Sequence, residues 1–476
     1  IPSSPGVAMK DRIMEMHRSS KVKNMSQETE PIELGRKKGH LETEHFDLEE
    51  NLRVMYAKQQ IVEIGAVALE RSKPYSMVLE LGNQSLFESS NVSVQTVAGG
   101  GGCCKMGMQD GKTKDSLFHY PSGVTVDTEG IIYIADKWNH VVRRIDPGSN
   151  QVTTVAGVPG NSGGTDGAGR RALFSYPSAI CYEKKNGNVF VGDSDDHRIR
   201  CLTPIGDVRT LPGIQDKDAI RAQSGSLDSL NTSALYVKRS RRQIPGTLTS
   251  SSIGFRYEYD PVRYPLRGIA FCPVYRDVFT TSVNDNRVRE HSQVLGHELH
   301  TLCGVCDCGH MDGPASSSKF SSPAGLAYDD RGSILYVADM RNHAIRRITI
   351  GESWATDRIE TLVETIAGHD NGRPGIEDGL GTKAGFWHPV GIALGGGGEL
   401  FISERNGRRI RRVSSTGNVT TIAGTPLLEQ SSSNAPRDGV GTEARFGNLG
   451  ALCVDSKNRR LIVADLDAHS IKTIYA

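Results

Sequence analysis

Short apolar runs recur along most of the chain, and each run ends in a polar turn. Residues 334–348 read Ile-Leu-Tyr-Val-Ala-Asp-Met-Arg-Asn-His-Ala-Ile-Arg-Arg-Ile, and nearly the same order occurs at 131–145 and 461–472. A second phrase, Val-Thr-Thr-Val-Ala-Gly at 152–157, returns almost unchanged at 94–99 and 419–424. Such β-branched runs predict short strands, and their recurrence predicts a repeat architecture.

Each repeat presents the same elements in the same order. It opens with an Asp-Gly turn, has a Phe eight residues after that Asp, and continues with four apolar strands. Five units show this spacing: Asp110 with Phe118, Asp166 with Phe174, Asp312 with Phe320, Asp378 with Phe386, and Asp438 with Phe446. A sixth, degenerate unit starts near Tyr264. Six four-stranded units predict an all-β protein, a six-bladed β-propeller.

The two ends of the repeat region complement each other. The last unit stops at Ala476 after its third strand, whereas residues 94–98 are an isolated copy of a fourth strand. We therefore expect the strand at 94–98 to complete the last blade, because this closes the ring and removes both free sheet edges. The predicted propeller domain spans residues 93–476.

Two segments fall outside the repeats. Residues 1–92 form a predicted N-terminal extension, with a polar flexible arm over 1–40 and a helix over 43–70, where apolar residues follow a loosely helical spacing. That helix either packs on the propeller or docks a partner. The second segment is an insertion at 214–263, and irregular insertions of this length are usually functional or disordered.

The turn motif Ala-Asp-x-x-Asn-His-x-Ile-Arg is specific, and it resembles the NHL repeat over residues 93–476. The third unit departs from it with Ser282 and Asn286, and the fifth with Glu404 and Arg408. The resemblance implies a six-bladed propeller and brings two functions with it. Some NHL domains of regulatory proteins bind single-stranded RNA on a basic face. The similar peptide-amidating lyases hold a metal in the central channel with histidines from several blades.

Charge and composition narrow the range of partners. The chain has 56 Lys and Arg against 55 Asp and Glu, a net charge of +1, so no global field attracts nucleic acid or an anionic membrane. Its basic residues do not alternate with aromatic residues that would stack bases, which argues against nucleic acid as a partner. No apolar run approaches the roughly 18 residues of a membrane span. The Asn-x-Ser/Thr sequons are compatible with secretion, and they are equally compatible with a cytoplasmic protein, since such sequons arise easily by chance.

Aspartate and histidine recur four residues apart in four units, for example at Asp136 and His140. An Asp can orient a catalytic His, but a pair that occurs in four blades does the same local job in each. We therefore interpret these pairs as hydrogen-bonded pins of the turn between the second and third strands. The paired arginines, such as Arg346 and Arg347, place one side chain on each face of a blade. We expect them to pair with carboxylates of adjacent blades.

A cluster of potential zinc ligands precedes the fourth unit. Cys303, Cys306, Cys308 and His310 form a local Cys₃His set, although the spacing is tighter than in common zinc loops. Local disulfides or free thiols explain the same residues equally well. No other cofactor is predicted.

Linkers from each fourth strand to the next first strand all open on one face of a propeller. This face should carry the Asp-Gly turns, the linker cysteines Cys103 and Cys104, and the insertion with its furin-type basic run, in which Arg239, Arg241 and Arg242 lie. We therefore predict a non-catalytic scaffold that binds a protein or peptide on this face. The first alternative is a metal-dependent lyase or hydrolase with His119 and His388 facing the channel, and the second is binding of single-stranded RNA.

Overall fold

A computed structural model describes residues 92–100, 104–194, 198–211, 266–273, 276–283, 286–291, 299–351, 361–426 and 435–476. The predicted arm at 1–40, the predicted helix at 43–70 and the insertion at 214–263 lie outside the described residues. The basic run of Arg239, Arg241 and Arg242 lies outside them as well, and so does Cys103.

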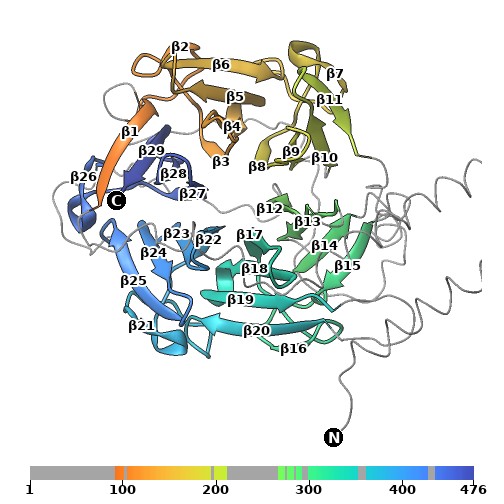
Figure 1. Cartoon of the computed structure of the whole chain (residues 1–476), viewed down its shortest axis with the longest axis vertical. Coiled ribbons are helices and arrows are strands. Elements are labelled where there is room, and N and C mark those ends of the chain that lie inside the picture. Colours follow the sequence, from red (N-terminus) through yellow and green to blue (C-terminus); the bar gives the residue numbers. More distant parts are fainter. Residues whose placement is uncertain are drawn as a thin grey trace, which may run out of the picture. The chain divides into compact units, whose positions relative to one another are not determined.

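Six antiparallel sheets stand around a central axis as the blades of a ring (Figure 1). This confirms the predicted six-bladed β-propeller. The strands of blades 1 to 3 are β2 (Gly111–Lys112), β3 (Pro121–Val126), β4 (Ile132–Asp136), β5 (Val141–Asp146), β6 (Gln151–Ala156), β7 (Gly167–Ala168), β8 (Pro177–Tyr182), β9 (Val189–Asp193), β10 (Arg198–Leu202), β11 (Asp207–Thr210), β12 (Leu266–Phe271), β13 (Val278–Ser282), β14 (Arg287–His291) and β15 (Leu299–Cys303).

The remaining strands build blades 4 to 6. They are β16 (Gly313–Pro314), β17 (Pro323–Asp329), β18 (Ile334–Asp339), β19 (Ala344–Thr349), β20 (Leu362–Ala367), β21 (Gly379–Leu380), β22 (Pro389–Leu394), β23 (Leu400–Glu404), β24 (Arg409–Val413), β25 (Asn418–Ala423), β26 (Gly439–Val440), β27 (Leu449–Asp455), β28 (Arg460–Asp465), β29 (Ser470–Tyr475) and, from the start of the propeller, β1 (Ser93–Gly99). Short 3₁₀ turns follow several strands: η1 (Lys137–Asn139), η2 (Gly169–Arg171), η3 (Met340–Asn342), η4 (Gly381–Lys383) and η5 (Gly441–Glu443).

Five of the blades have a fifth, two-residue strand that the repeat pattern did not predict. In blade 1 this strand is β2, which pairs with β6 at the outer edge, so that Gly111 faces Val152. The Asp-Gly turns therefore lie on the outer edge of the blades, and their predicted place on the linker face is wrong. A strand of two residues has no periodicity, so the apolar pattern could not reveal it.

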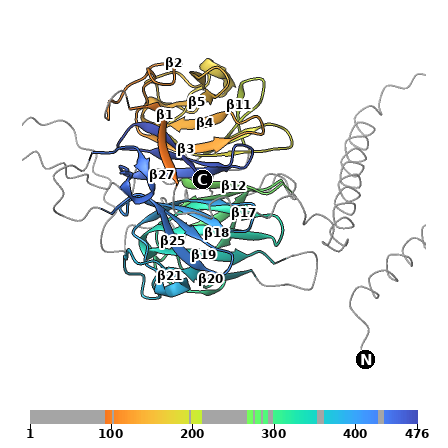
Figure 2. The ribbon, with the colours of Figure 1, turned by 60° about the vertical axis from the view of Figure 1, so that its left-hand side comes forward.

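The ring closes as the sequence predicts. Strand β1 pairs along β29, with Ser93 opposite Tyr475 and Gly99 opposite Ser470, and it contacts β26 on its other side. Figures 1 and 2 show this N-terminal strand beside the C-terminal end of the chain. Strand β1 thereby covers the edge that β29 would otherwise expose, and such a free edge could recruit another chain.

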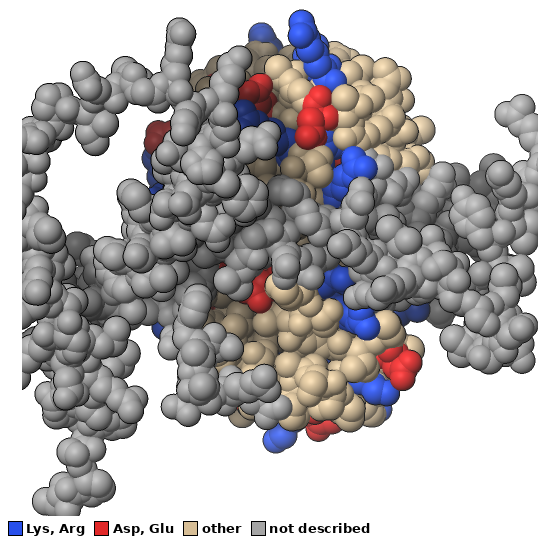
Figure 3. Space-filling model, turned by 90° about the vertical axis from the view of Figure 1, so that its right-hand side faces the viewer, with Lys and Arg blue, Asp and Glu red and all other residues tan. Residues whose placement is uncertain are grey.

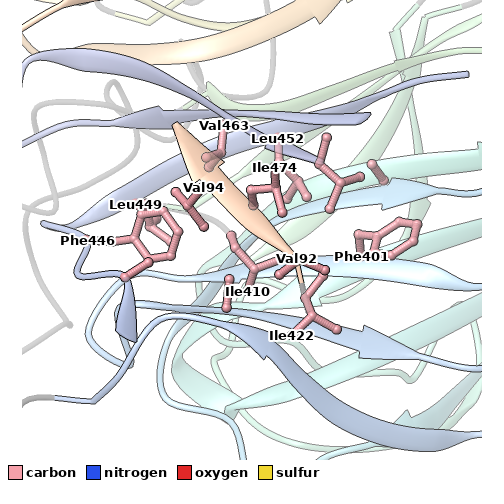
Figure 4. Packing of buried hydrophobic residues seen from close by; sticks show 14 residues of the cluster. Val92, Val94, Phe401, Ile410, Ile422, Phe446, Leu449, Leu452, Val463 and Ile474 are labelled. Atoms are coloured by element: carbon pink, nitrogen blue, oxygen red, sulfur yellow. The ribbon is translucent and has the colours of Figure 1, made fainter. Parts of the chain in front are cut away.

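The core lies between the blades. Each buried hydrophobic cluster in the described part of the chain combines residues of two adjacent blades. Figure 4 shows the cluster between blades 5 and 6, where Val94 of β1 joins Ile410, Phe446 and Ile474. The apolar strand residues therefore hold each blade against its neighbours around the ring. No helix among these residues is long and apolar enough to cross a membrane.

Two kinds of connection meet at one end of the ring, which we call the linker face. In blade 1 the start of β3 lies opposite the end of β4, with Pro121 paired to Asp136. The linker that enters β3 and the turn from β4 to β5 are therefore neighbours at this face. The opposite face carries the turns from first to second and from third to fourth strands.

Candidate functional site

A buried network of an acidic residue and an arginine lies near the linker end of blades 1, 2, 4 and 5. In blade 1, Asp136 is fully buried, and its Oδ1 accepts a hydrogen bond from the backbone N–H of His119 at 2.9 Å. Its Oδ2 accepts from Asn139 Nδ2 and from Arg143 Nη1, each at 2.8 Å. Arg143 Nη1 also donates to the carbonyl of Leu117 at 2.8 Å. One carboxylate therefore fixes the turn, the linker and the third strand of the same blade.

The Asp of the Asp-Gly turn and the Phe eight residues later complete this network. Arg143 Nη2 lies 2.8 Å from Asp110 Oδ1, and the same carboxylate accepts bonds from the backbone and side chain of Thr154. The guanidinium lies 4.7 Å from the centroid of the Phe118 ring, within the range of cation–π attraction. The same arrangement recurs around Arg200, Arg346 and Arg411.

These contacts correct the expectation for the paired arginines. The carboxylates that bind Arg346 belong to its own blade, since Asp312 precedes β16 and Asp339 ends β18. The following residue, Arg347, is partly exposed and pairs with Glu364 of the neighbouring strand β20. The linker folds back along its own blade before it enters the first strand, and this places the Asp within reach of the buried arginine.

The histidine of the motif works across the blade boundary. His140 Nδ1 accepts a hydrogen bond from the backbone N–H of Tyr176 in blade 2 at 3.2 Å. His469 accepts from Tyr120 in the same way at 3.1 Å, and thus joins blade 6 to blade 1. Of each Asp–His pair, only the Asp holds the turn of its own blade, as predicted for both residues. The His instead fixes the entry to the next blade.

Burial shifts the pKa values of these groups in opposite directions. Desolvation raises the pKa of Asp136, Asp339 and Asp465 to about 6, even with a cation beside each of them, so all three stay ionised at neutral pH. Burial, with a second histidine nearby, lowers the pKa of His343 and His469 to about 4. The neutral rings can therefore accept hydrogen bonds at Nδ1.

The central channel opens between the first strands of all six blades. A cavity of about 90 Å³ lies there, lined by small residues such as Gly268 and Gly325 and by three cations, Lys137, Arg267 and Arg405. Small-molecule sites usually measure about 300–1,000 Å³, so this cavity suits a small group. His119 and His388 do not line it. Their rings lie beside His469 and His343, at centroid distances of 5.8 and 4.7 Å.

A row of aromatic rings lies at the linker face beside the channel. Trp138 is 37% exposed, and its ring centroid lies 6.4 Å from Tyr120 and 5.5 Å from Tyr176. Both contacts are edge-to-face, a favourable geometry for aromatic pairs. Arg405 Nη2 of blade 5 donates to the Tyr120 hydroxyl at 3.1 Å, which links this aromatic row to the channel. Tyr120 and Tyr176 each precede the Pro that begins the first strand of their blade, but Trp138 stands at another motif position. The repeat pattern alone therefore does not reveal the row.

The potential zinc ligands differ in their exposure. Cys303 is buried in β15, and burial raises the pKa of its thiol, whereas Cys306 and Cys308 are exposed. His310 Nε2 lies 2.9 Å from Thr365 Oγ1. Within the described ranges no group of three or more His, Cys, Asp or Glu is placed to hold a metal. Zinc binding stays a prediction, as do the binding-face roles of Cys104 and of the basic insertion.

Known proteins support the assignment of the repeats. A family model described as the NHL repeat matches residues 118–145 and 174–202. NHL repeat-containing protein 2 of Homo sapiens is 28% identical over 324 residues, which cover 64% of this chain and 40% of that protein. Protein SUPPRESSOR OF QUENCHING 1, chloroplastic, of Arabidopsis thaliana is 25% identical over 318 residues, which cover 64% of this chain and 26% of that protein. The matched part is less than half of each relative.

Solved structures share the fold. A structural genomics protein of unknown function from Bacteroides thetaiotaomicron superposes with a TM-score of 0.55 at 17% identity, covering 81% of this chain and 76% of that chain. An auxiliary nutrient binding protein of the same organism gives a TM-score of 0.54 at 17% identity, covering 80% and 76%. Likeness at this identity concerns architecture alone. The chain therefore contains NHL repeats, and its described residues form a six-bladed β-propeller.

Proposed function

We propose that this propeller is a non-catalytic scaffold that binds a protein or peptide segment on its linker face. The observation that carries the proposal is the aromatic row of Tyr120, Trp138 and Tyr176. Tryptophan and tyrosine dominate the binding energy of protein interfaces, because they bury a large area with few rotatable bonds. Trp138 offers such an area at the surface.

The row is held rigidly, which favours binding. The backbone N–H of Tyr120 donates to His469, and that of Tyr176 donates to His140, so each tyrosine is fixed by the preceding blade. A surface that is ordered before binding loses little conformational entropy when a partner arrives. The Tyr120 hydroxyl and Arg405, which donates to it, add directional polar groups beside the apolar area.

The alternatives receive less support from these residues. A channel lyase or hydrolase with His119 and His388 stays a prediction, since neither histidine lines the channel cavity. For RNA, a basic face is the expected feature, and on the coloured part of the face drawn in Figure 3 basic and acidic side chains lie next to one another. We therefore base the proposal on the aromatic row and not on charge.

A peptide selection tests the proposal. Peptides would be selected from a random phage library on the purified chain, and their affinity measured by fluorescence anisotropy. We expect Trp138→Ala to weaken a selected peptide by at least about 30-fold, the effect of a 2 kcal/mol hot spot. The control is Ile205→Ala, which removes another exposed apolar side chain, 84% accessible, on the opposite face. Equal affinities for the wild type and Trp138→Ala would refute the proposal.

A further inference from the structure

Arg405 is a partly exposed arginine that directly follows β23 at the linker face of blade 5. Its Nη2 donates a hydrogen bond to the hydroxyl of Tyr120 in blade 1 at 3.1 Å. Among the described residues, no carboxylate oxygen lies within 4.0 Å of its guanidinium nitrogens. The buried arginines of the blade network differ, because each of them binds two carboxylates. Arg405 therefore has N–H donors left for a group from outside the chain.

One carboxylate lies in the wider neighbourhood of Arg405. Asp467 of blade 6 interacts electrostatically with both Arg405 and Arg408. Its Oδ2 accepts a hydrogen bond from the backbone N–H of Asn448 at 3.2 Å. Asp467 thus serves two arginines and a backbone amide, and it makes no direct ion pair with Arg405. The guanidinium stays able to bind a second carboxylate.

The Tyr120 hydroxyl is a second donor beside this guanidinium. Its oxygen accepts the bond from Arg405, so its own hydrogen is directed elsewhere, and no acceptor in the described part of the chain takes it. The two donor atoms lie 3.1 Å apart, which suits the two oxygens of one carboxylate. They come from blades 5 and 1, so the closed ring creates this donor pair.

The donor pair lies at one end of the aromatic row. The Tyr120 ring belongs to the row and its hydroxyl to the donor pair, so one ligand can contact both. Trp138, whose ring centroid lies 6.4 Å from that of Tyr120, offers the exposed apolar area. The ring of His119, 5.6 Å from Trp138, is uncharged at neutral pH because burial lowers its pKa. The row therefore supplies apolar contact, and Arg405 supplies the charge.

We propose that the segment bound at the linker face carries an acidic side chain, which binds Arg405 and Tyr120 while a neighbouring apolar residue packs on Trp138. This inference rests on the proposed function and names the kind of peptide involved. Arginine matches a carboxylate with paired donors, and arginine, tryptophan and tyrosine are the residues enriched at binding hot spots. The row lies on one side of the donor pair and blade 5 on the other, so the segment can continue in both directions. We therefore assign the carboxylate to an Asp or Glu and not to a chain end.

Peptides selected on the purified chain provide the probe. Each peptide whose binding depends on Trp138 would be synthesised with a C-terminal amide, so that its only carboxylates belong to side chains. We expect replacement of one of its Glu by Gln, or Asp by Asn, to weaken binding to the wild type by at least about tenfold and binding to Arg405→Met by less than about twofold. Arg373→Met removes an exposed charge from a linker, and as the matched control it should respond like the wild type.

Tyr120→Phe gives a second test that removes a single hydroxyl. It should melt at the wild-type temperature and weaken the same peptide by at least about threefold, and it carries the comparison if Arg405→Met does not fold. Equal losses on the wild type and Arg405→Met, or Trp138-dependent peptides that lack Asp and Glu, would overturn the acidic segment while the scaffold proposal stands. Tighter binding of the free-acid peptide would assign the carboxylate to a chain end and overturn the side-chain assignment. Absence of any Trp138-dependent peptide would overturn both proposals.

Discussion

The imidazole Nδ1 of His343 accepts a hydrogen bond from the backbone N–H of His388 at 3.1 Å. His343 lies in the left-handed region at φ 52°, just before β19 of blade 4, and His388 immediately precedes β22 of blade 5. The turn of one blade therefore fixes where the first strand of the next blade begins. Only the neutral imidazole can accept this bond, and burial together with His388 lowers the pKa of His343 to about 4.

This bond makes the stability of the ring depend on pH. The folded state holds His343 neutral down to about pH 4, whereas in the unfolded chain it takes up a proton below about pH 6.5. The contribution of His343 is therefore complete above pH 6.5 and is lost as the pH falls towards 4. The three buried aspartates, with pKa values raised to about 6, act in the opposite sense over the same range. A substitution at the histidine is needed to isolate its effect.

Blade 3 shows which substitution to choose. There Asn286, at φ 56°, accepts the equivalent bond from Ser322 at 2.9 Å through its Oδ1. As the pH falls from 7 to 5, the free energy of unfolding of His343→Asn should rise by roughly 1 kcal/mol relative to that of the wild type, after allowance for solvent screening. Urea unfolding at both pH values measures the difference. The reciprocal Asn286→His should lose stability over the same range, and parallel pH profiles for all three proteins would exclude the mechanism.

In blade 4 a glycine follows the fourth strand, and the turn that contains His343 leaves no room for a side chain there. Gly368 has φ 105°, and a Cβ atom there would lie 2.5 Å from the carbonyl oxygen of His343. We expect Gly368→Ala to lower the free energy of unfolding by about 3 kcal/mol, because it combines a strained φ with a clash against the backbone. Gly160→Ala is the matched control, since Gly160 has φ 75° and open space around it, and should cost only about 1 kcal/mol. Equal losses in thermal melts would show that the clash is relieved.

The blades and the closure of the ring could be predicted from the sequence because the repeats share one set of spacings. The constant spacing from Asp110 to Phe118 reflects one guanidinium that binds the first and stacks on the second, so the spacing had to recur with the blade. Ring closure followed from counting strands, because the isolated phrase at 94–99 had no other blade to join. The outer strands, such as β2, were missed because their two residues carry no periodic signal.

The candidate site was harder to predict for the opposite reason. Trp138 stands where the other blades have unrelated, polar residues, so a comparison of the repeats does not single it out. Its place in the aromatic row depends on what lies beside it in space, namely Tyr176 of the next blade. Such neighbours become visible only when the ring and its register are known.

Arg346 and the next residue, Arg347, form ion pairs that differ in burial. The Arg346 side chain is fully buried, with Nη1 2.7 Å from Asp339 Oδ2 and Nη2 2.6 Å from Asp312 Oδ1. Arg346→Met leaves the buried Asp339 carboxylate without its cation, and we expect a loss of about 3–5 kcal/mol in urea unfolding. Arg347→Met removes only a half-exposed pair with Glu364 and should cost less than about 1 kcal/mol.

A second substitution distinguishes the stranded charge from lost packing. Asp339→Asn removes the carboxylate charge while keeping an acceptor for the backbone N–H of Ser321, which now donates to Asp339 Oδ1 at 2.8 Å. Added to Arg346→Met, it should recover part of the stability, because no charge then remains buried without a partner. Asp339 Oδ2 also accepts a bond from Asn342 Nδ2 at 2.8 Å, so Asp339→Asn in the wild-type background is the control for the loss of that bond. If the double variant recovers no stability after this control is subtracted, the charge left without a partner does not account for the loss.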